Sequence, residues 1–265
     1  MNKLPTANKE LGQHFLISEK VIDAITTDFI EKCDVIVEVG PGPAILSKKL
    51  SQHKKPYYVI EKDSRFLSQL ETVVDKENIF IEDALNFNWQ NFVNTYSLNN
   101  KDIWLVSNLP YNVGTVLFTN FLSIKEIKYM SLMFQKEVGD KTYFRQGKNQ
   151  MNGLLFQSLN YFDSNKLIKV SPGCFSPPPK VESVVVSYKR KSLPDISIDE
   201  YKILNTFTRA LFSMKRKQIG TVLKRFYDKA KLDMVFSTTQ IDPRTRAETL
   251  SYDQVLTIYK NLSHD

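Results

Sequence analysis

Hydrophobic positions in the first two thirds of the chain fall into short runs, separated by stretches with helical spacing. The runs are rich in β-branched and aromatic residues and lie at Val35–Val39, Tyr57–Ile60, Ile79–Ile81, Ile103–Val106, Tyr129–Phe134 and Val181–Tyr188. Helix-compatible stretches lie between them at Ile45–Gln52 and Arg65–Val73, and Ser18 is the expected N-cap of an earlier helix. Strands that alternate with helices predict a parallel, doubly wound α/β sheet.

The pattern changes near residue 190. The segment Lys189–Asp195 is polar, contains a proline and is predicted to be a linker. Beyond it, apolar residues follow three helical stripes, at Tyr201, Leu204, Phe207, Leu211 and Phe212, at Ile219, Val222, Leu223 and Phe226, and at Val255, Leu256, Tyr259 and Leu262. We therefore expect an α/β domain at residues 1–190 and a small helical domain at residues 191–265.

The basic charge of the chain is concentrated in its last third. The net charge is +7, and 42% of the 265 residues are hydrophobic, enough to bury a core. Residues 1–188 hold 21 Lys and Arg against 20 Asp and Glu, whereas residues 189–265 hold 15 against 9, a net of +6. Basicity confined to one segment is typical of a phosphate-binding surface. A run of charge by itself is more often a solvated helical face, so it supports a polyanionic partner only together with other features.

Composition also excludes several classes of protein. The first residues, Met1–Pro5, lack the apolar region of a secretory signal, and no apolar run reaches the ~18 residues of a membrane span. Cys33 and Cys174 lie far apart and do not have the spacing of metal ligands. We expect a cytoplasmic enzyme without a metal and without a membrane partner.

A glycine turn follows the first hydrophobic run, at Gly40-Pro41-Gly42. Such a turn lets a ligand approach the backbone without meeting a Cβ atom, although a plain strand-to-helix turn is about as common. The dinucleotide fingerprint needs a third glycine where this chain has Ile45, which disfavours a dinucleotide dehydrogenase. Pro41 also removes one N–H that a phosphate would need. These residues favour a nucleoside ligand without phosphates.

Acidic side chains end the second and third runs. Glu61 stands where doubly wound folds place the carboxylate that accepts the ribose hydroxyls. Asp83 is placed to accept a hydrogen bond from an adenine amine, and Glu82 competes with it, although the strand period points the two to opposite faces. The turn and the two acids on three successive strand ends predict an adenosine pocket.

The fourth run leads into Asn108-Leu109-Pro110-Tyr111. The N6 amine of adenine is a poor nucleophile because its lone pair is delocalised into the ring. The Asn108 side-chain oxygen and the Leu109 carbonyl could accept its two hydrogens and expose that lone pair, while Pro110 stiffens the turn. Tyr111 could stack on the base, which must leave its own stack to enter such a pocket, for about 1–3 kcal/mol. The motif favours methyl transfer to an exocyclic amine, driven mainly by alignment.

These motifs closely resemble those of the ribosomal RNA adenine N6,N6-dimethyltransferases, and of their bacterial small-subunit members in particular. The resemblance spans nearly the whole chain and rests on Leu11–Leu16, Glu38–Gly42, Asn108–Tyr111, Gln135–Val138, Phe175–Ser183 and Arg246–Ser251. It implies a Rossmann-like S-adenosylmethionine methyltransferase sheet with a small C-terminal α-helical domain. The implied reaction dimethylates N6 of adenines, two adjacent ones near the 3′ end of 16S rRNA, during small-subunit biogenesis. S-adenosylmethionine is the implied methyl donor.

The resemblance also implies roles for individual residues. His14 and Leu16 would cover the methionine end of the cofactor, and Phe175 would face Tyr111 across the target adenine. The rest of the cofactor site is implied to consist of Gly40, Glu61, Asp83 and Asn108. The implied RNA-binding side chains of the helical domain are Lys215, Arg216, Lys217, Lys224 and Arg225. We expect a monomer that acts on 16S rRNA in the small subunit or its precursor.

The chain departs from the family pattern in two places. His14 stands where many relatives have asparagine, and the segment Arg145–Gly153 lacks the tyrosine that usually precedes its glycine. Two alternatives also remain. One is a large-subunit rRNA methyltransferase of the antibiotic-resistance type, against which Leu109 and Arg246–Ser251 argue. The other is a non-catalytic RNA-binding relative, against which the complete set of cofactor and catalytic residues argues.

Overall fold

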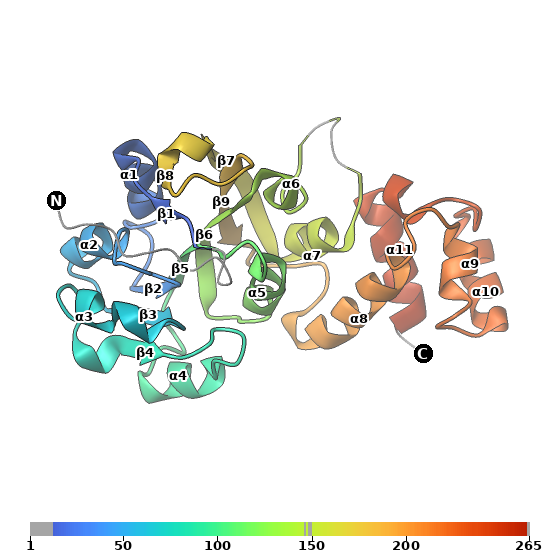
Figure 1. Cartoon of the computed structure of the whole chain (residues 1–265). Helices are drawn as coiled ribbons and strands as arrows, with labels where there is room; N and C mark the ends of the chain where they lie inside the picture. Colours follow the sequence, from blue (N-terminus) through green and yellow to red (C-terminus); the bar gives the residue numbers. More distant parts are fainter. Residues whose placement is uncertain (1–12, 146, 148–149, 264–265) are drawn as a thin grey trace. The chain divides into compact units, whose positions relative to one another are not determined.

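The computed structural model describes residues 13–145, 147 and 150–263 (Figure 1). The described chain forms two compact units, each considered by itself. The sheet unit contains the described residues up to Asp140 together with Ser164–Arg190. The helical unit contains Lys141–Asp163 and the chain from Lys191 onwards. The division at residues 190 and 191 falls where the sequence places its linker, but residues 141–163 group with the C-terminal helices and not with the preceding α/β domain.

A seven-stranded sheet with the order β4-β3-β2-β5-β6-β9-β7 forms the centre of the sheet unit. Its strands are β2 (Val35–Val39), β3 (Tyr57–Glu61), β4 (Ile79–Ile81), β5 (Ile103–Asn108), β6 (Ile127–Gln135), β7 (Phe162–Val170) and β9 (Ser183–Arg190). The five strands from β4 to β6 are parallel, and β9 pairs antiparallel with β6. A separate antiparallel pair joins β1 (Phe15–Leu16) to β8 (Phe175–Ser176).

The α-helices of the sheet unit are short, and helices and strands alternate along the chain from β1 to β6 (Figure 1). They are α1 (Glu19–Thr27), α2 (Ser47–Leu50), α3 (Leu67–Leu70), α4 (Trp89–Thr95), α5 (Gly114–Leu122) and α6 (Lys136–Gly139). Short 3-10 helices lie at Ser51–His53, Ser64–Phe66, Lys76–Asn78 and Pro172–Cys174.

Burial explains why the strands are visible in the sequence. All five residues of β2 are buried, including Glu38, because β2 is covered on both faces and flanked by β3 and β5. Strands buried in this way appear as continuous hydrophobic runs. In α1, the apolar residues Val21, Ile22 and Ile25 share one face and pack into the core.

The helical unit is built from α7 (Gly153–Tyr161), α8 (Tyr201–Leu211), α9 (Ile219–Leu223), α10 (Lys229–Thr239) and α11 (Tyr252–Ser263), with 3-10 turns at Ile198–Glu200 and Ala247–Thr249. Polar contacts join α7 to the later part of the unit. The Gln157 Nε2 atom donates to the Thr208 Oγ1 atom at 2.7 Å, and Asn160 exchanges two hydrogen bonds of 3.0 Å with the backbone of Ile196. These contacts hold residues 141–163 within the helical unit.

The observed elements match the sequence predictions where hydrophobic runs are strong and differ where they are weak. The structure has the predicted strands at Val35–Val39 and Ile79–Ile81, and those at β3, β5, β6 and β9 are shifted or extended by a few residues. The predicted parallel, doubly wound sheet is confirmed for the five strands from β4 to β6, and β9 adds an antiparallel strand beside β6. The pattern also missed β1, β7, β8 and α10. No helix in the described residues is long and apolar enough to span a membrane.

Candidate active site

A cavity opens at the carboxyl ends of β2, β3, β4 and β5 in the sheet unit. The strand order reverses between β2 and β5, and crevices at such a point are the usual ligand sites of open α/β sheets. All but one of the predicted catalytic and cofactor residues line this cavity, namely His14, Leu16, Gly40, Glu61, Asp83, Asn108, Leu109, Pro110 and Tyr111.

The glycine turn has the backbone conformation that its sequence predicts. Gly40 and Gly42 have φ angles of +69° and +54°, in the left-handed region that glycine enters without strain. A Cβ atom built on Gly40 would meet no atom within 4 Å, so the backbone there borders open space. Ala44 follows with a φ of 61°, and the regular helix α2 begins only at Ser47.

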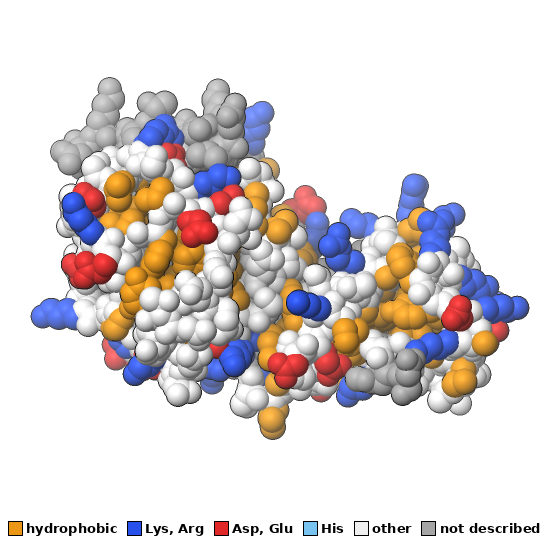
Figure 2. All heavy atoms as spheres, turned by 90° about the horizontal axis from the view of Figure 1, so that it is seen from below, with side chains coloured by type: hydrophobic (Ala, Val, Ile, Leu, Met, Phe, Trp, Pro, Cys, Tyr) orange, Lys and Arg blue, Asp and Glu red, His pale blue; other side chains and the backbone are white. Residues whose placement is uncertain are grey.

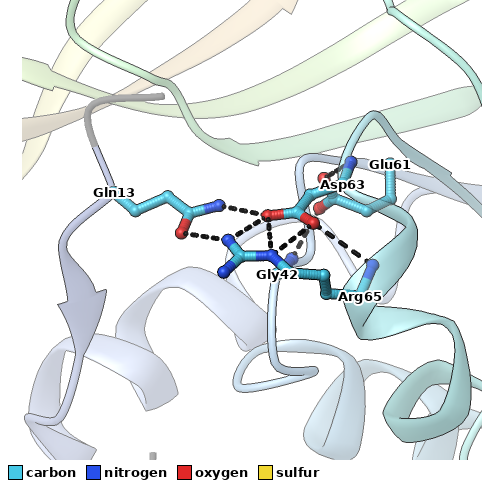
Figure 3. Close-up of polar contacts among 5 residues, drawn as sticks. All are labelled: Gln13, Gly42, Glu61, Asp63 and Arg65. Atoms are coloured by element: carbon cyan, nitrogen blue, oxygen red, sulfur yellow. Dashed lines mark hydrogen bonds and ion pairs between the residues drawn. The ribbon is translucent and has the colours of Figure 1, made fainter. Parts of the chain in front are cut away.

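Glu61 lies at the end of β3 with its carboxylate turned into the glycine turn. The Gly42 N–H donates to its Oε2 atom at 2.9 Å, and the Asp63 N–H donates to its Oε1 atom at 2.7 Å (Figure 3). Glu61 is only 6% exposed, and burial raises its pKa above the ordinary value, opposed by these backbone hydrogen bonds. Each oxygen keeps a lone pair, since a carboxylate offers about four acceptor positions.

Asp83 is held at the end of β4 by two donors. The Lys62 Nζ atom pairs with its Oδ2 atom at 2.8 Å, and the Leu85 N–H donates to its Oδ1 atom at 3.0 Å. The Lys62 ammonium, followed by the Leu85 hydrogen bond, lowers the pKa of Asp83. Glu82 also lines the cavity, so strand alternation did not separate the two acids: the strand ends at Ile81, before either of them.

Asn108 ends β5 with its amide in a defined orientation. Its Nδ2 atom donates to the His14 carbonyl oxygen at 3.2 Å, which leaves the Oδ1 atom available as an acceptor. The next residue, Leu109, is anchored by its N–H to the Met133 carbonyl at 3.2 Å. The Pro110 carbonyl accepts from the first turn of α5, whereas the structure shows no described residue donating to the Leu109 carbonyl. The two acceptors that the motif predicts are therefore open.

Tyr111 is half-buried beside His14. Its hydroxyl shares a 2.7 Å hydrogen bond with the Ser183 Oγ atom, and burial raises its pKa. The His14 ring lies 5.5 Å from the Tyr111 ring, between centroids, at an angle of 31°. The His14 Nδ1 atom lies 2.8 Å from the Pro177 carbonyl oxygen, which can only accept, so Nδ1 carries a hydrogen. The histidine that replaces asparagine therefore has a structural partner.

Phe175 is the exception among the predicted site residues. It pairs with Leu16 in the β1–β8 ladder, is 3% exposed and belongs to the hydrophobic core of the sheet unit. It does not line the cavity, and the ring that Tyr111 meets is that of His14.

Three cavity residues have interactions that the motif analysis did not assign. Gln13 begins a segment that lines the cavity, and Lys62 is paired with Asp83. Glu38 is 1% exposed, accepts hydrogen bonds from Ser47 and Tyr57 on one oxygen, and has its pKa raised by burial to about 7. Gln13 and Glu38 belong to the motifs that resemble the family, but their partners lie on other elements and could not be predicted from the sequence.

The five basic residues of the helical unit, Lys215, Arg216, Lys217, Lys224 and Arg225, are all exposed. Within the described chain, the structure shows no ion pair for any of them. On the face seen in Figure 2, Lys and Arg side chains gather around the helical unit, in the right part of the view, beside an apolar area. Among the described residues, no group of His, Cys, Asp or Glu is arranged to hold a metal ion.

The sheet order, the glycine turn and the acids at successive strand ends define the Rossmann-like fold of the S-adenosylmethionine-dependent methyltransferases. Within that class, the chain belongs to the ribosomal RNA adenine dimethylase family, whose model matches residues 5–264. Similar curated proteins carry the name ribosomal RNA small subunit methyltransferase A. The protein of Clostridium botulinum (strain Okra / Type B1) is 36% identical, over 93% of this chain and 90% of its own length. That of Staphylococcus carnosus (strain TM300) is 33% identical, over 96% and 89%.

Solved structures share the fold at lower sequence identity. A dimethyladenosine transferase from Plasmodium falciparum has a TM-score of 0.72 and 22% identity, covering 92% of this chain and 96% of that one. The 23S rRNA methyltransferase ErmE has a TM-score of 0.66 and 20% identity, covering 94% and 100%.

The cavity suits the adenosyl part of S-adenosylmethionine. The open space at Gly40 lets a ligand approach the backbone, and the Glu61 oxygens keep acceptor positions for two ribose hydroxyls. Among the described residues that line the cavity, Lys62 is the one Lys or Arg, and Asp83 neutralises it. A cavity without free cationic charge is poorly suited to a phosphate-bearing ligand.

Proposed function

We propose that the protein uses S-adenosylmethionine to dimethylate the N6 amines of adenines, two adjacent ones near the 3′ end of 16S rRNA, during small-subunit biogenesis. The observation that carries the proposal is the orientation of Asn108, whose amide nitrogen is bound to His14 and whose oxygen is left as an acceptor. The family and the names of the 33–36% identical relatives support the rRNA substrate and the small subunit. We further propose that the protein acts as a monomer in the cytoplasm.

In this proposal, the strand ends hold the cofactor. Glu61 accepts the ribose hydroxyls, Asp83 accepts from the adenine amine, and Gly40 lets the ligand approach the backbone. His14 and Leu16 cover the methionine end. When bound, S-adenosylmethionine supplies an activated methyl group on sulfur. Asp83 keeps Lys62 as a partner, and the resulting low pKa keeps its carboxylate charged at neutral pH.

Residues of the motif at the end of β5 prepare the target amine. The Asn108 Oδ1 atom and the Leu109 carbonyl accept its two hydrogens and draw the nitrogen towards tetrahedral geometry. Tyr111 stacks on the extruded base, and its bond to Ser183 anchors the hydroxyl end of its side chain. No strong base is needed because the product amine releases its proton after transfer. Positioning accounts for most of the rate, as expected when two reactants are held in line.

The exposed cations of the helical unit are proposed to bind the rRNA backbone. Lys215, Arg216, Lys217, Lys224 and Arg225 project from the region before α9 and from its end. Neutralising phosphates releases counterions, so this contact adds affinity without reading sequence. The target adenines would be selected in the cavity of the sheet unit.

The decisive experiment measures single-turnover methylation by the wild type and by Asn108→Ala at saturating cofactor. Purified small and large ribosomal subunits serve as separate substrates, and mass spectrometry detects dimethyladenosine. We expect product only on the small subunit and a rate at least a hundredfold lower for Asn108→Ala, by analogy with the loss of one oxyanion-hole donor, which costs about 2.7–4 kcal/mol. Asn120→Ala, in α5 and away from the cavity, is the matched control.

Each alternative has its own outcome in this experiment. Methylation of the large subunit alone would identify an enzyme of the antibiotic-resistance type. A wild-type protein that binds neither S-adenosylmethionine nor S-adenosylhomocysteine would be a non-catalytic RNA-binding relative. A near wild-type rate for Asn108→Ala would refute the role given to its amide.

A further inference from the structure

The start of the described chain is tied to the loop after β3 by a polar cluster (Figure 3). The Gln13 Nε2 atom donates to the Asp63 Oδ2 atom at 3.0 Å, although the two residues are 50 positions apart. The Arg65 side chain binds the same carboxylate with Nε at 2.9 and 3.1 Å and with one terminal nitrogen at 2.5 Å. That terminal nitrogen also lies 3.5 Å from the Gln13 Oε1 atom. We call Gln13, Asp63 and Arg65 the latch.

The latch holds one end of a segment that lines the cavity. Residues Gln13–Leu16, which we call the strap, all contribute to the cavity wall. The other end of the strap is fixed by the β1–β8 pairing and by the bond between the Ile17 N–H and the Cys174 carbonyl, 2.8 Å long. The strap is therefore anchored at both of its ends, and Gln13 connects it to the loop after β3.

Two of the ligand-facing groups of the proposed site, Glu61 and Asn108, are connected to the latch. The Asp63 N–H donates to Glu61, so the residue that binds Gln13 also orients the carboxylate proposed for the ribose. The strap residue next to Gln13 is His14, whose carbonyl accepts from the Asn108 amide. A displacement of Gln13 would move this carbonyl and release the orientation of Asn108.

Burial, packing and charge all stabilise the contacts of the latch. Asp63 is 8% exposed, and Arg65 lies over the Phe66 ring with its guanidinium 5.7 Å from the ring centroid. The Arg65 hydrogen bonds, followed by those of Gln13 and the Arg65 backbone, lower the pKa of Asp63 to about 2 against the opposing effect of burial. The carboxylate is therefore charged at any pH at which the protein would work, and charged acceptors form the stronger hydrogen bonds.

We propose that Gln13, Asp63 and Arg65 are positioning residues that close the strap over the bound cofactor and thereby set how fast it dissociates. This inference rests on the proposed function for the identity of the ligand. Cofactor exchange requires the strap to leave the cavity wall, and the Gln13–Asp63 bond must break for the β3 side to open. The latch therefore acts on the dissociation rate more than on the association rate.

The test uses S-adenosylhomocysteine and the full-length protein without RNA, with calorimetry for affinity and stopped-flow competition for dissociation. Asp63→Asn keeps the side-chain shape and the backbone N–H that Glu61 needs. The matched control is Asp242→Asn, because Asp242 binds Arg244 through the same atoms, at 2.8–3.1 Å, in the helical unit. We expect dissociation about tenfold faster for Asp63→Asn, as for loss of one hydrogen bond to a charged group. Asp242→Asn should match the wild type.

Hydrogen exchange separates a latch from a general loss of structure. In the ligand-free protein, the Ile17 amide should exchange faster in Asp63→Asn than in Asp242→Asn, while amides of the central strand β2 stay protected. Gln13→Ala is a second variant that leaves the Asp63–Arg65 pair intact and should have the same two effects. S-adenosylhomocysteine should dissociate from the double variant no faster than from Asp63→Asn alone, because both changes break the same contact.

Three results bear on the proposal separately. Equal dissociation rates for Asp63→Asn, Gln13→Ala and Asp242→Asn would overturn the latch while leaving the proposed function intact. Additive effects in the double variant would overturn it as well, since the two residues would then act independently. A wild-type protein without affinity for S-adenosylhomocysteine would instead refute the proposed function.

Discussion

Replacement of Glu61 by alanine tests the cofactor site most directly. Two of the acceptor positions on its carboxylate are taken by the Gly42 and Asp63 N–H groups, so one position per oxygen remains for the two ribose hydroxyls. The expected loss is that of a hydrogen bond to a charged group, about 1.5–3 kcal/mol. We expect affinity for S-adenosylhomocysteine to fall about 10- to 150-fold.

A ligand lacking one hydroxyl makes the assignment specific. For the wild type, calorimetry should show weaker binding of the 2′-deoxy analogue than of S-adenosylhomocysteine. For Glu61→Ala, the two ligands should bind alike, because the acceptor of the missing hydroxyl is already gone. Glu71→Ala is the control for loss of one negative charge, since Glu71 is exposed and does not line the cavity.

The pH dependence of binding gives an independent check. Burial raises the pKa of Glu61, and the charged form is the better acceptor, so affinity should decline on acidification at a higher pH than for an exposed glutamate. Glu61→Ala should lose this decline. A penalty for the deoxy analogue that is equal in wild type and variant would remove Glu61 from the ribose site, whatever the change in affinity.

Three further predictions concern other parts of the molecule. Tyr111→Phe should retain substantial single-turnover activity because the ring remains, whereas Tyr111→Ala should lose base capture worth about 1–3 kcal/mol; equal loss in both would assign the role to the hydroxyl. Replacing Lys215, Arg216 and Lys217 by alanine should weaken RNA binding and leave the affinity for S-adenosylhomocysteine unchanged. The slope of log affinity against log salt should fall by about 0.7–0.9 per lost phosphate contact. An unaltered slope would mean that these side chains contact only solvent. Glu38 has a pKa raised from 4.5 to about 7, so the folded protein binds more protons than the unfolded chain in that range and loses stability as pH rises through it. In urea unfolding, the free energy of unfolding of Glu38→Gln relative to that of the wild type should therefore rise by about 3 kcal/mol between pH 4.5 and 7. A difference that does not depend on pH would contradict the assignment.

Local conformation and chemistry could be predicted from the sequence because neighbouring residues determine them. The hydrophobic run of β2 predicts a buried strand, since a strand covered on both faces needs apolar residues throughout. Gly40 and Gly42 predict a turn with positive φ angles, which the structure has. The carboxyl ends of parallel strands share one edge of the sheet, and this rule alone brings Glu61, Asp83 and Asn108 to the same cavity.

Tertiary structure decided what depends on partners distant in the chain. The amide orientation of Asn108 is set by the His14 carbonyl, 94 positions away, and the partner of Gln13 is Asp63. Phe175 lies in the core and does not line the cavity; it belongs to the β1–β8 pair, two strands of two residues each that are too short to leave a periodic signal. The grouping of residues 141–163 with the C-terminal helices likewise follows from polar contacts such as Gln157 with Thr208. Hydrophobic periodicity records which face of an element is buried, and it contains no information on which other element covers that face.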